Sequence, residues 1–176
     1  MFVEDQWFRS APGATTPSPW HQDGPYYSIA EPFLTAWIPL DPAGSDAGLR
    51  LVPGSHRWPT EYAPVEFAAD GTTTVGASAA PAAPDADRDP ALEVVVPAVS
   101  PGDAVWFWSG VLHAAGGRAP ATRPFRRLSI RYAPGTATYR DRGDAAAAFW
   151  RLLDHGLHDG DPLACPTFPV VHAEPT

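Results

Sequence analysis

The chain has 176 residues, of which 44% are hydrophobic, and a formal net charge of −8. This length predicts a single domain, residues 1–176, that is large enough to bury its own core. The negative charge argues against a nucleic-acid partner or an anionic membrane surface, because both require a basic face, and no apolar run approaches the ~20 residues that span a bilayer.

Short strands separated by turns dominate the pattern. Strand-like segments are predicted at residues 33–40, 49–52, 92–96, 103–108 and 128–132. The 22 prolines favour short elements, because proline is excluded from helix interiors and central strands. Met1 leads almost at once into strand-like sequence, so we expect the chain to begin inside a larger fold. These features favour a mainly β sandwich or barrel.

Two further segments differ from this pattern. Residues 68–90 are rich in Ala, Pro, Thr and Asp, and they predict a long surface loop or lid insertion. Residues 145–153 predict one C-terminal helix, with Asp144 as its cap and Gly156 as its stop. The lone Cys165 cannot form an internal disulfide, and no signal-peptide pattern is present, so we expect a cytoplasmic protein. The oligomeric state is not predicted.

Two histidines and one carboxylate form a pattern typical of a mononuclear iron site. In a strand, residues i and i+2 point to the same face, so His21 and Asp23 offer two ligands to one point. His113 follows the predicted strand 103–108 across a Ser-Gly turn and offers a third ligand. Two imidazoles and one carboxylate leave positions on Fe(II) open for a co-substrate and O₂. The pattern therefore predicts an oxygenase site.

This pattern leaves two alternatives open. His21 hydrogen-bonded to Asp23 is also a common structural arrangement without metal. His56 is a rival ligand, although its Pro-Gly-Ser-His turn favours a solvated or capping role.

The sequence after the distal histidine offers an anchor for an acidic co-substrate. A 2-oxo acid supplies the electrons that such an iron site needs, and an arginine holds its far carboxylate through a bidentate contact. The candidates are Arg118, Arg123, Arg126, Arg127 and Arg131. Arg127 and Ser129 share one face of the predicted strand with Arg131, whereas Arg126 points the other way. The alternative is that these are exposed charges on an edge strand.

Four segments of the chain resemble motifs of one protein family and occur in the same order as in that family. They are residues 17–23 around the His-x-Asp motif, residues 48–57 (GLRLVPGSHR), residues 101–113 ending at the distal histidine, and residues 126–132 (RRLSIRY). Together they span most of residues 2–135 and resemble the phytanoyl-CoA dioxygenase (PhyH) family.

The resemblance implies a double-stranded β-helix, or jelly roll, that uses Fe(II), 2-oxoglutarate and O₂. It implies that His21, Asp23 and His113 bind the iron. It also implies that Gln22 and Trp37 border 2-oxoglutarate, and that an arginine after the distal histidine grips the far carboxylate.

The chain departs from the family in two places. The family's arginine falls at the position occupied here by Pro124. Arg127 is our preferred anchor because Ser129 accompanies it, and Arg126 is the second choice. The chain is also short ahead of the first metal motif, which predicts an N-terminally truncated jelly roll.

These observations favour an Fe(II)- and 2-oxoglutarate-dependent dioxygenase that hydroxylates a small metabolite or natural-product intermediate. Asp23 fills the position that related halogenases leave free for chloride, so hydroxylation, or another oxidation such as desaturation, is favoured. Tyr26 and Tyr27 are candidates to line the substrate pocket, with ordinary packing as the alternative. Two other functions remain open: a cupin-like metal-dependent isomerase or hydrolase, and an inactive jelly-roll binding module.

Overall fold

The computed structural model describes residues 1–42, 46–67, 73–75, 78–143, 150 and 152–171. Most of the predicted helix over residues 145–153, and its predicted cap Asp144, lie outside the described residues. None of the helices in the described part of the chain is long and apolar enough to cross a membrane.

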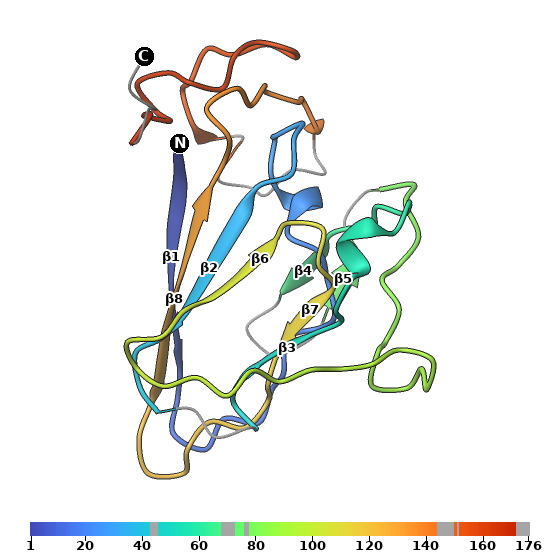
Figure 1. The fold of residues 1–176 in the computed structure, drawn as a ribbon, viewed down its shortest axis with the longest axis vertical. Coiled ribbons are helices and arrows are strands. Elements are labelled where there is room, and N and C mark those ends of the chain that lie inside the picture. Colours follow the sequence, from blue (N-terminus) through green and yellow to red (C-terminus); the bar gives the residue numbers. More distant parts are fainter. Residues whose placement is uncertain (43–45, 68–72, 76–77, 144–149, 151, 172–176) are drawn as a thin grey trace.

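The described elements are short antiparallel strands and two 3-10 turns (Figure 1). In chain order they are β1 (Phe2–Ser10), η1 (Gly24–Tyr26), β2 (Leu34–Pro39), β3 (Leu49–Leu51), η2 (Ser55–Arg57), β4 (Val65–Phe67), β5 (Thr73–Val75), β6 (Val105–Trp108), β7 (His113–Ala115) and β8 (Phe125–Tyr132). A four-stranded sheet has the order β1-β8-β2-β6, and β3-β7 and β4-β5 form two-stranded sheets. The predicted mainly β architecture is confirmed.

The strands mostly fall where the sequence pattern predicts them. Residues 33–40, 49–52 and 103–108 contain β2, β3 and β6, and residues 128–132 form the second part of the longer β8. The prediction for residues 92–96 is wrong, because this segment makes only an isolated bridge between Val95 and Leu51. Val95 and Val96 are each 37% exposed, so this β-branched run lies at the surface instead of inside a sheet.

The pleat of the large sheet separates its residues into two faces. Trp37 pairs with Ser129 across β2 and β8, and Thr35 pairs with Arg131. On the other side of β8, Phe8 of β1 pairs with Arg127. Paired residues share a face, so β1, β8 and β2 present these side chains toward the interior together.

Two apolar clusters stabilise this arrangement on either side of the sheet's polar residues. Phe107 and Phe125 pack with Trp37 between the large sheet and the β3-β7 pair. At the other end, Phe33 and Phe168 are each 1% exposed and pack in a cluster that joins the start of the chain to its C-terminal segment. Full burial of one such side chain contributes about 1.5–3 kcal/mol.

The described part of the predicted 68–90 insertion packs against the body of the protein. β4 and β5 pair with each other, and residue 73 is where β5 begins. Asp87 accepts hydrogen bonds from Trp20 Nε1 at 3.1 Å and from Arg50 Nη1 at 2.7 Å. Ala86 is 4% exposed and packs with Trp20 in an apolar cluster. Residues 86–87 are therefore held beside Trp20, which directly precedes the His-x-Asp motif.

Candidate metal and co-substrate site

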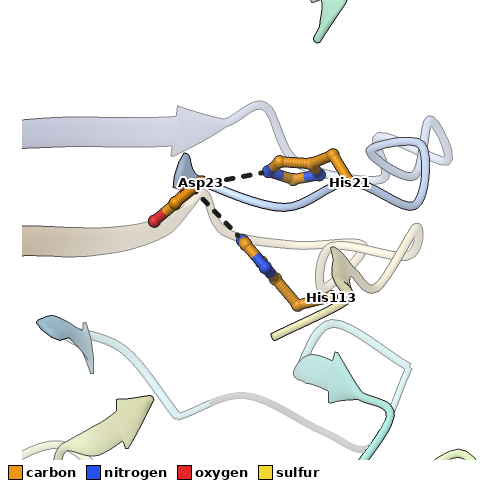
Figure 2. Close-up of side chains that lie close together, drawn as sticks. All are labelled: His21, Asp23 and His113. Atoms are coloured by element: carbon orange, nitrogen blue, oxygen red, sulfur yellow. Dashed lines mark ion pairs between the residues drawn. The ribbon is translucent and has the colours of Figure 1, made fainter. Parts of the chain in front are cut away.

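The three predicted metal ligands come together at one point. His21 and His113 form an antiparallel bridge, with backbone N–O distances of 3.0 and 2.9 Å, and Asp23 lies just before η1. Asp23 Oδ1 lies 3.9 Å from His21 Nε2 and 3.6 Å from His113 Nε2. Figure 2 shows both imidazoles directed at this carboxylate. The ligand atoms of all three residues lie within 4.8 Å of one another.

The backbone fixes which nitrogen each imidazole offers to a metal. His21 Nδ1 lies 2.9 Å from the carbonyl oxygen of Pro19, and His113 Nδ1 lies 2.9 Å from that of Val111. A carbonyl only accepts, so each Nδ1 carries the proton and each Nε2 keeps a free lone pair. Metal-binding histidines are typically oriented in this way. The donor set therefore fits a divalent transition metal.

Burial keeps these ligands in the protonation states that a metal requires. Burial, followed by the neighbouring His113, lowers the pKa of His21 to about 3. Burial also lowers the pKa of His113. Burial would raise the pKa of Asp23, but the charge of Arg131 and the two imidazoles outweigh it and hold that pKa below its usual range. At neutral pH the site therefore offers two neutral imidazoles and one carboxylate.

We expect the metal-free protein to lose stability as the pH falls below about 6.5. Below this ordinary histidine pKa, the unfolded chain takes up protons that the folded His21 refuses until about pH 3. Each such group removes up to about 1.4 kcal/mol per pH unit over that window. Urea unfolding at pH 7 and pH 5 measures the loss, which should be smaller in a His21→Asn variant. An equal free energy of unfolding at both pH values would contradict the prediction.

A cavity of about 480 Å³ opens beside the three ligands, between the large sheet and β7. His21, Asp23 and His113 line it together with the two residues predicted to anchor a carboxylate, Arg127 and Ser129. The metal ligands and this Arg-Ser pair therefore face one common space.

Arg127 is a half-buried cation without an acidic partner among the described residues. Its Nη1 donates to Ser10 Oγ at 2.9 Å, and its guanidinium carbon lies 5.3 and 5.5 Å from the ring centroids of Phe8 and Phe125. Burial lowers its pKa. A desolvated guanidinium without a counter-ion favours binding of an anion from solution.

Arg126, the second choice of anchor, does not reach the cavity. It points to the opposite face of β8, where Asp41 accepts hydrogen bonds from its Nη2 at 2.7 Å and its Nε at 2.9 Å. Its side chain is 47% exposed. Its cation is already neutralised at the surface, which argues against Arg126 as the anchor.

Of the two residues that the resemblance places beside 2-oxoglutarate, the structure brings one to the cavity. Trp37 lines it, but Gln22 does not. Gln22 Nε2 donates to the carbonyl of Gly110 at 3.0 Å, and its Oε1 accepts from the backbone of Tyr62 at 3.1 Å. Because His21 and Asp23 point to one side, the residue between them points to the other. The expectation for Gln22 is therefore not met by its position.

Both tyrosines line the cavity, and both hydroxyls are engaged by the protein. Tyr26 donates to the carbonyl of Val65 at 2.8 Å and accepts from its backbone N–H at 2.6 Å. Tyr27 is 2% exposed, packs on Phe33 and donates to Glu4. These contacts fit the packing role of Tyr27, while substrate contact by either ring stays a prediction.

His56, the rival ligand, is exposed in η2 and does not belong to the metal-ligand group of the described residues. Three polar residues that the sequence pattern did not single out do reach the site: Glu4, Gln6 and Thr35. Glu4 and Gln6 are alternate residues of β1, which is a weak indication that they share a face.

Two solved structures with a similar fold come from nogalamycin biosynthesis. The α-ketoglutarate-dependent epimerase SnoN from nogalamycin biosynthesis is 21% identical, with a TM-score of 0.66 over 96% of this chain and 61% of its own. The carbocyclase SnoK from the same biosynthesis is 23% identical, with a TM-score of 0.67 over 96% of this chain and 60% of its own. The chain thus spans about three fifths of the length of these two proteins.

A third similar structure contains the co-substrate itself. EvdO2 from Micromonospora carbonacea var. aurantiaca, complexed with 2-oxoglutarate, is 26% identical, with a TM-score of 0.51 over 74% of this chain and 53% of its own. SnoN has also been crystallised with Fe3+, α-ketoglutarate and nogalamycin RO. No curated protein sequence matches the chain.

The sequence profile of the phytanoyl-CoA dioxygenase (PhyH) family matches residues 2–125, which is more than half of the chain. This match runs through the first metal motif, β2, β3 and the distal histidine, and so covers the three metal-ligand candidates, and it ends just before Arg127 and Ser129. The resemblance seen in the sequence is therefore confirmed: the chain belongs to the phytanoyl-CoA dioxygenase (PhyH) family.

Proposed function

We propose that this protein is an Fe(II)- and 2-oxoglutarate-dependent oxygenase that acts on a small natural-product intermediate. The observation that carries the proposal is one cavity lined both by a His-Asp-His ligand set and by Arg127, a half-buried arginine with no acidic partner among the described residues. Family membership and the iron- and 2-oxoglutarate-containing neighbours support the same cofactors.

His21, Asp23 and His113 would hold the iron through two Nε2 atoms and one carboxylate oxygen. Arg127 and Ser129 would bind the far carboxylate of 2-oxoglutarate by charge-assisted hydrogen bonds. Trp37, which is 4% exposed, would shield the co-substrate from water. When bound, iron with 2-oxoglutarate and O₂ supplies an oxidant strong enough to remove hydrogen from a C–H bond.

Hydroxylation is the reaction that we propose first, because Asp23 completes a carboxylate-containing ligand set. A different outcome of the same oxidation, stereochemical inversion or ring closure, is the second candidate, since SnoN is an epimerase and SnoK a carbocyclase. The product decides between them. Hydroxylation adds one oxygen atom, desaturation and ring closure each remove two hydrogen atoms, and epimerisation leaves the mass unchanged.

Anaerobic addition of Fe(II) and 2-oxoglutarate tests the proposal directly. We expect a visible charge-transfer absorption that appears with 2-oxoglutarate and not with succinate, which lacks the keto oxygen needed for chelation. On admission of O₂, succinate should form. Metal binding without this absorption would favour the cupin-like alternative, and absence of metal binding would favour an inactive binding module.

A further inference from the structure

We propose that Arg131 is a positioning residue for the iron ligand Asp23, and that Glu4 and Gln6 of β1 hold Arg131 in place. This inference rests on the proposed iron site. It adds a function for the first strand, because Glu4 and Gln6 hold the Arg131 guanidinium that contacts Asp23.

The two oxygens of Asp23 have different surroundings. Oδ2 accepts hydrogen bonds from Thr35 Oγ1 at 2.7 Å and from Arg131 Nε at 3.2 Å. Oδ1 faces both imidazole Nε2 atoms and has only a long contact, 3.4 Å, with Arg131 Nη2. Thr35 and Arg131 thus occupy the outer oxygen and leave the inner oxygen for a metal. This arrangement favours one-oxygen coordination by Asp23.

Arg131 is itself held from three sides. Its Nη1 donates to Glu4 Oε1 at 3.0 Å and to Gln6 Oε1 at 2.9 Å, and its guanidinium carbon lies 4.9 Å from the ring centroid of Tyr27. Its side chain is 7% exposed. Because so many donors of the rigid fork are engaged, the guanidinium cannot rotate without breaking several buried hydrogen bonds.

The pairing of β1 with β8 explains why these residues meet. Glu4 lies opposite Arg131 in the sheet, and Gln6 lies opposite Ser129 on the same face. Tyr27 also donates to Glu4, so the Glu4 carboxyl bridges a phenol and a guanidinium. A chain of contacts therefore runs from β1 through Arg131 to the metal ligand.

Arg131 can affect metal binding by orienting Asp23 or merely through its charge, and the two possibilities predict opposite changes in metal affinity when Arg131 is removed. A cation beside the site repels a divalent metal, so its loss would tighten metal binding if charge were its sole contribution. If Arg131 orients Asp23, its loss frees the carboxylate to rotate or to bind through both oxygens, and metal binding weakens. Outer partners of this kind typically contribute about 10- to 100-fold in metal affinity.

Co(II) titration of the metal-free full chain separates the two effects, with affinity and the visible Co(II) spectrum as readouts. We expect Arg131→Gln to weaken Co(II) binding by about tenfold or more and to change the spectrum. Arg131→Lys keeps the charge but loses the fork, so we expect the same direction of change. Arg126→Gln, on the same strand but on its outer face, is the matched control and should leave both readouts unchanged.

Gln6→Leu tests the same inference without removing Arg131, and thermal unfolding checks that each variant is folded. The Gln6→Leu variant should weaken Co(II) binding less than the Arg131 variants do but shift the Co(II) spectrum in the same direction. If the Arg131 variants do not fold, the Gln6→Leu result alone decides whether Arg131 positions Asp23. Unchanged or tighter Co(II) binding with an unchanged spectrum in the folded variants would overturn the positioning role. Failure of the wild-type chain to bind Co(II) would instead overturn the iron site, and the inference with it.

Discussion

Replacing His113 with alanine is expected to weaken Fe(II) binding by more than about 100-fold, since even the outer partners of metal ligands contribute 10- to 100-fold. His113 supplies one of three candidate ligands and is 5% exposed, and His21 is the one other imidazole in the ligand group of the described residues. Succinate formation should fall to background in parallel. Metal analysis after anaerobic loading, together with succinate measurement, tests the prediction.

His56→Ala is the matched control for this experiment. His56 lies in an exposed turn, so its loss should change neither iron content nor succinate formation. The comparison distinguishes the two assignments that the sequence left open for the third ligand. If His56→Ala lost iron and His113→Ala kept it, the ligand set described here would be wrong.

The sequence predicts that His21, Asp23 and His113 meet, because part of the constraint on them is local. The i and i+2 spacing of His21 and Asp23 already requires a common direction, and the distal His113 follows directly after a strong strand pattern. The same alternation predicts from the sequence alone that Arg126 and Arg127 point to opposite faces of one strand. The family resemblance places Gln22 beside the co-substrate. Gln22 lies between His21 and Asp23, however, and it is not among the residues that line their cavity.

Features that depend on pairing between distant strands are harder to predict. Nothing in the order of residues indicates that Glu4 would lie opposite Arg131, since that contact follows from β1 joining the edge of the large sheet. The segment 92–96 shows the reverse error. Its Val-rich sequence favours a strand, but it lacks a neighbouring strand to pair with beyond the single bridge to Leu51, and local propensity alone does not create a sheet.

Replacing Arg127 with alanine is expected to raise the KM for 2-oxoglutarate by about 10- to 150-fold, because hydrogen bonds to charged groups contribute about 1.5–3 kcal/mol. Three arginines of β8 differ in their partners. Asp41 neutralises Arg126, and Asp23 and Glu4 neutralise Arg131. Arg127 faces the cavity with a serine hydroxyl and two aromatic rings around it, so it is the cation that a dicarboxylate co-substrate would pair with.

The neighbouring Arg126→Ala variant is the control that isolates this effect. The two substitutions remove the same charge from adjacent positions of one strand, so any long-range electrostatic effect on the iron should be similar in both. The pair of Arg126 with Asp41 is largely at the surface, where such pairs contribute about 0–1 kcal/mol, and we expect the KM of that variant to stay near the wild-type value. Metal affinity measured without 2-oxoglutarate should not weaken in either variant, because the hydrogen-bond partners of Arg126 and Arg127 are Asp41 and Ser10 and not the iron ligands. An equal rise in KM for the two variants would show that charge alone matters, and would rule out Arg127 as the residue that grips the far carboxylate.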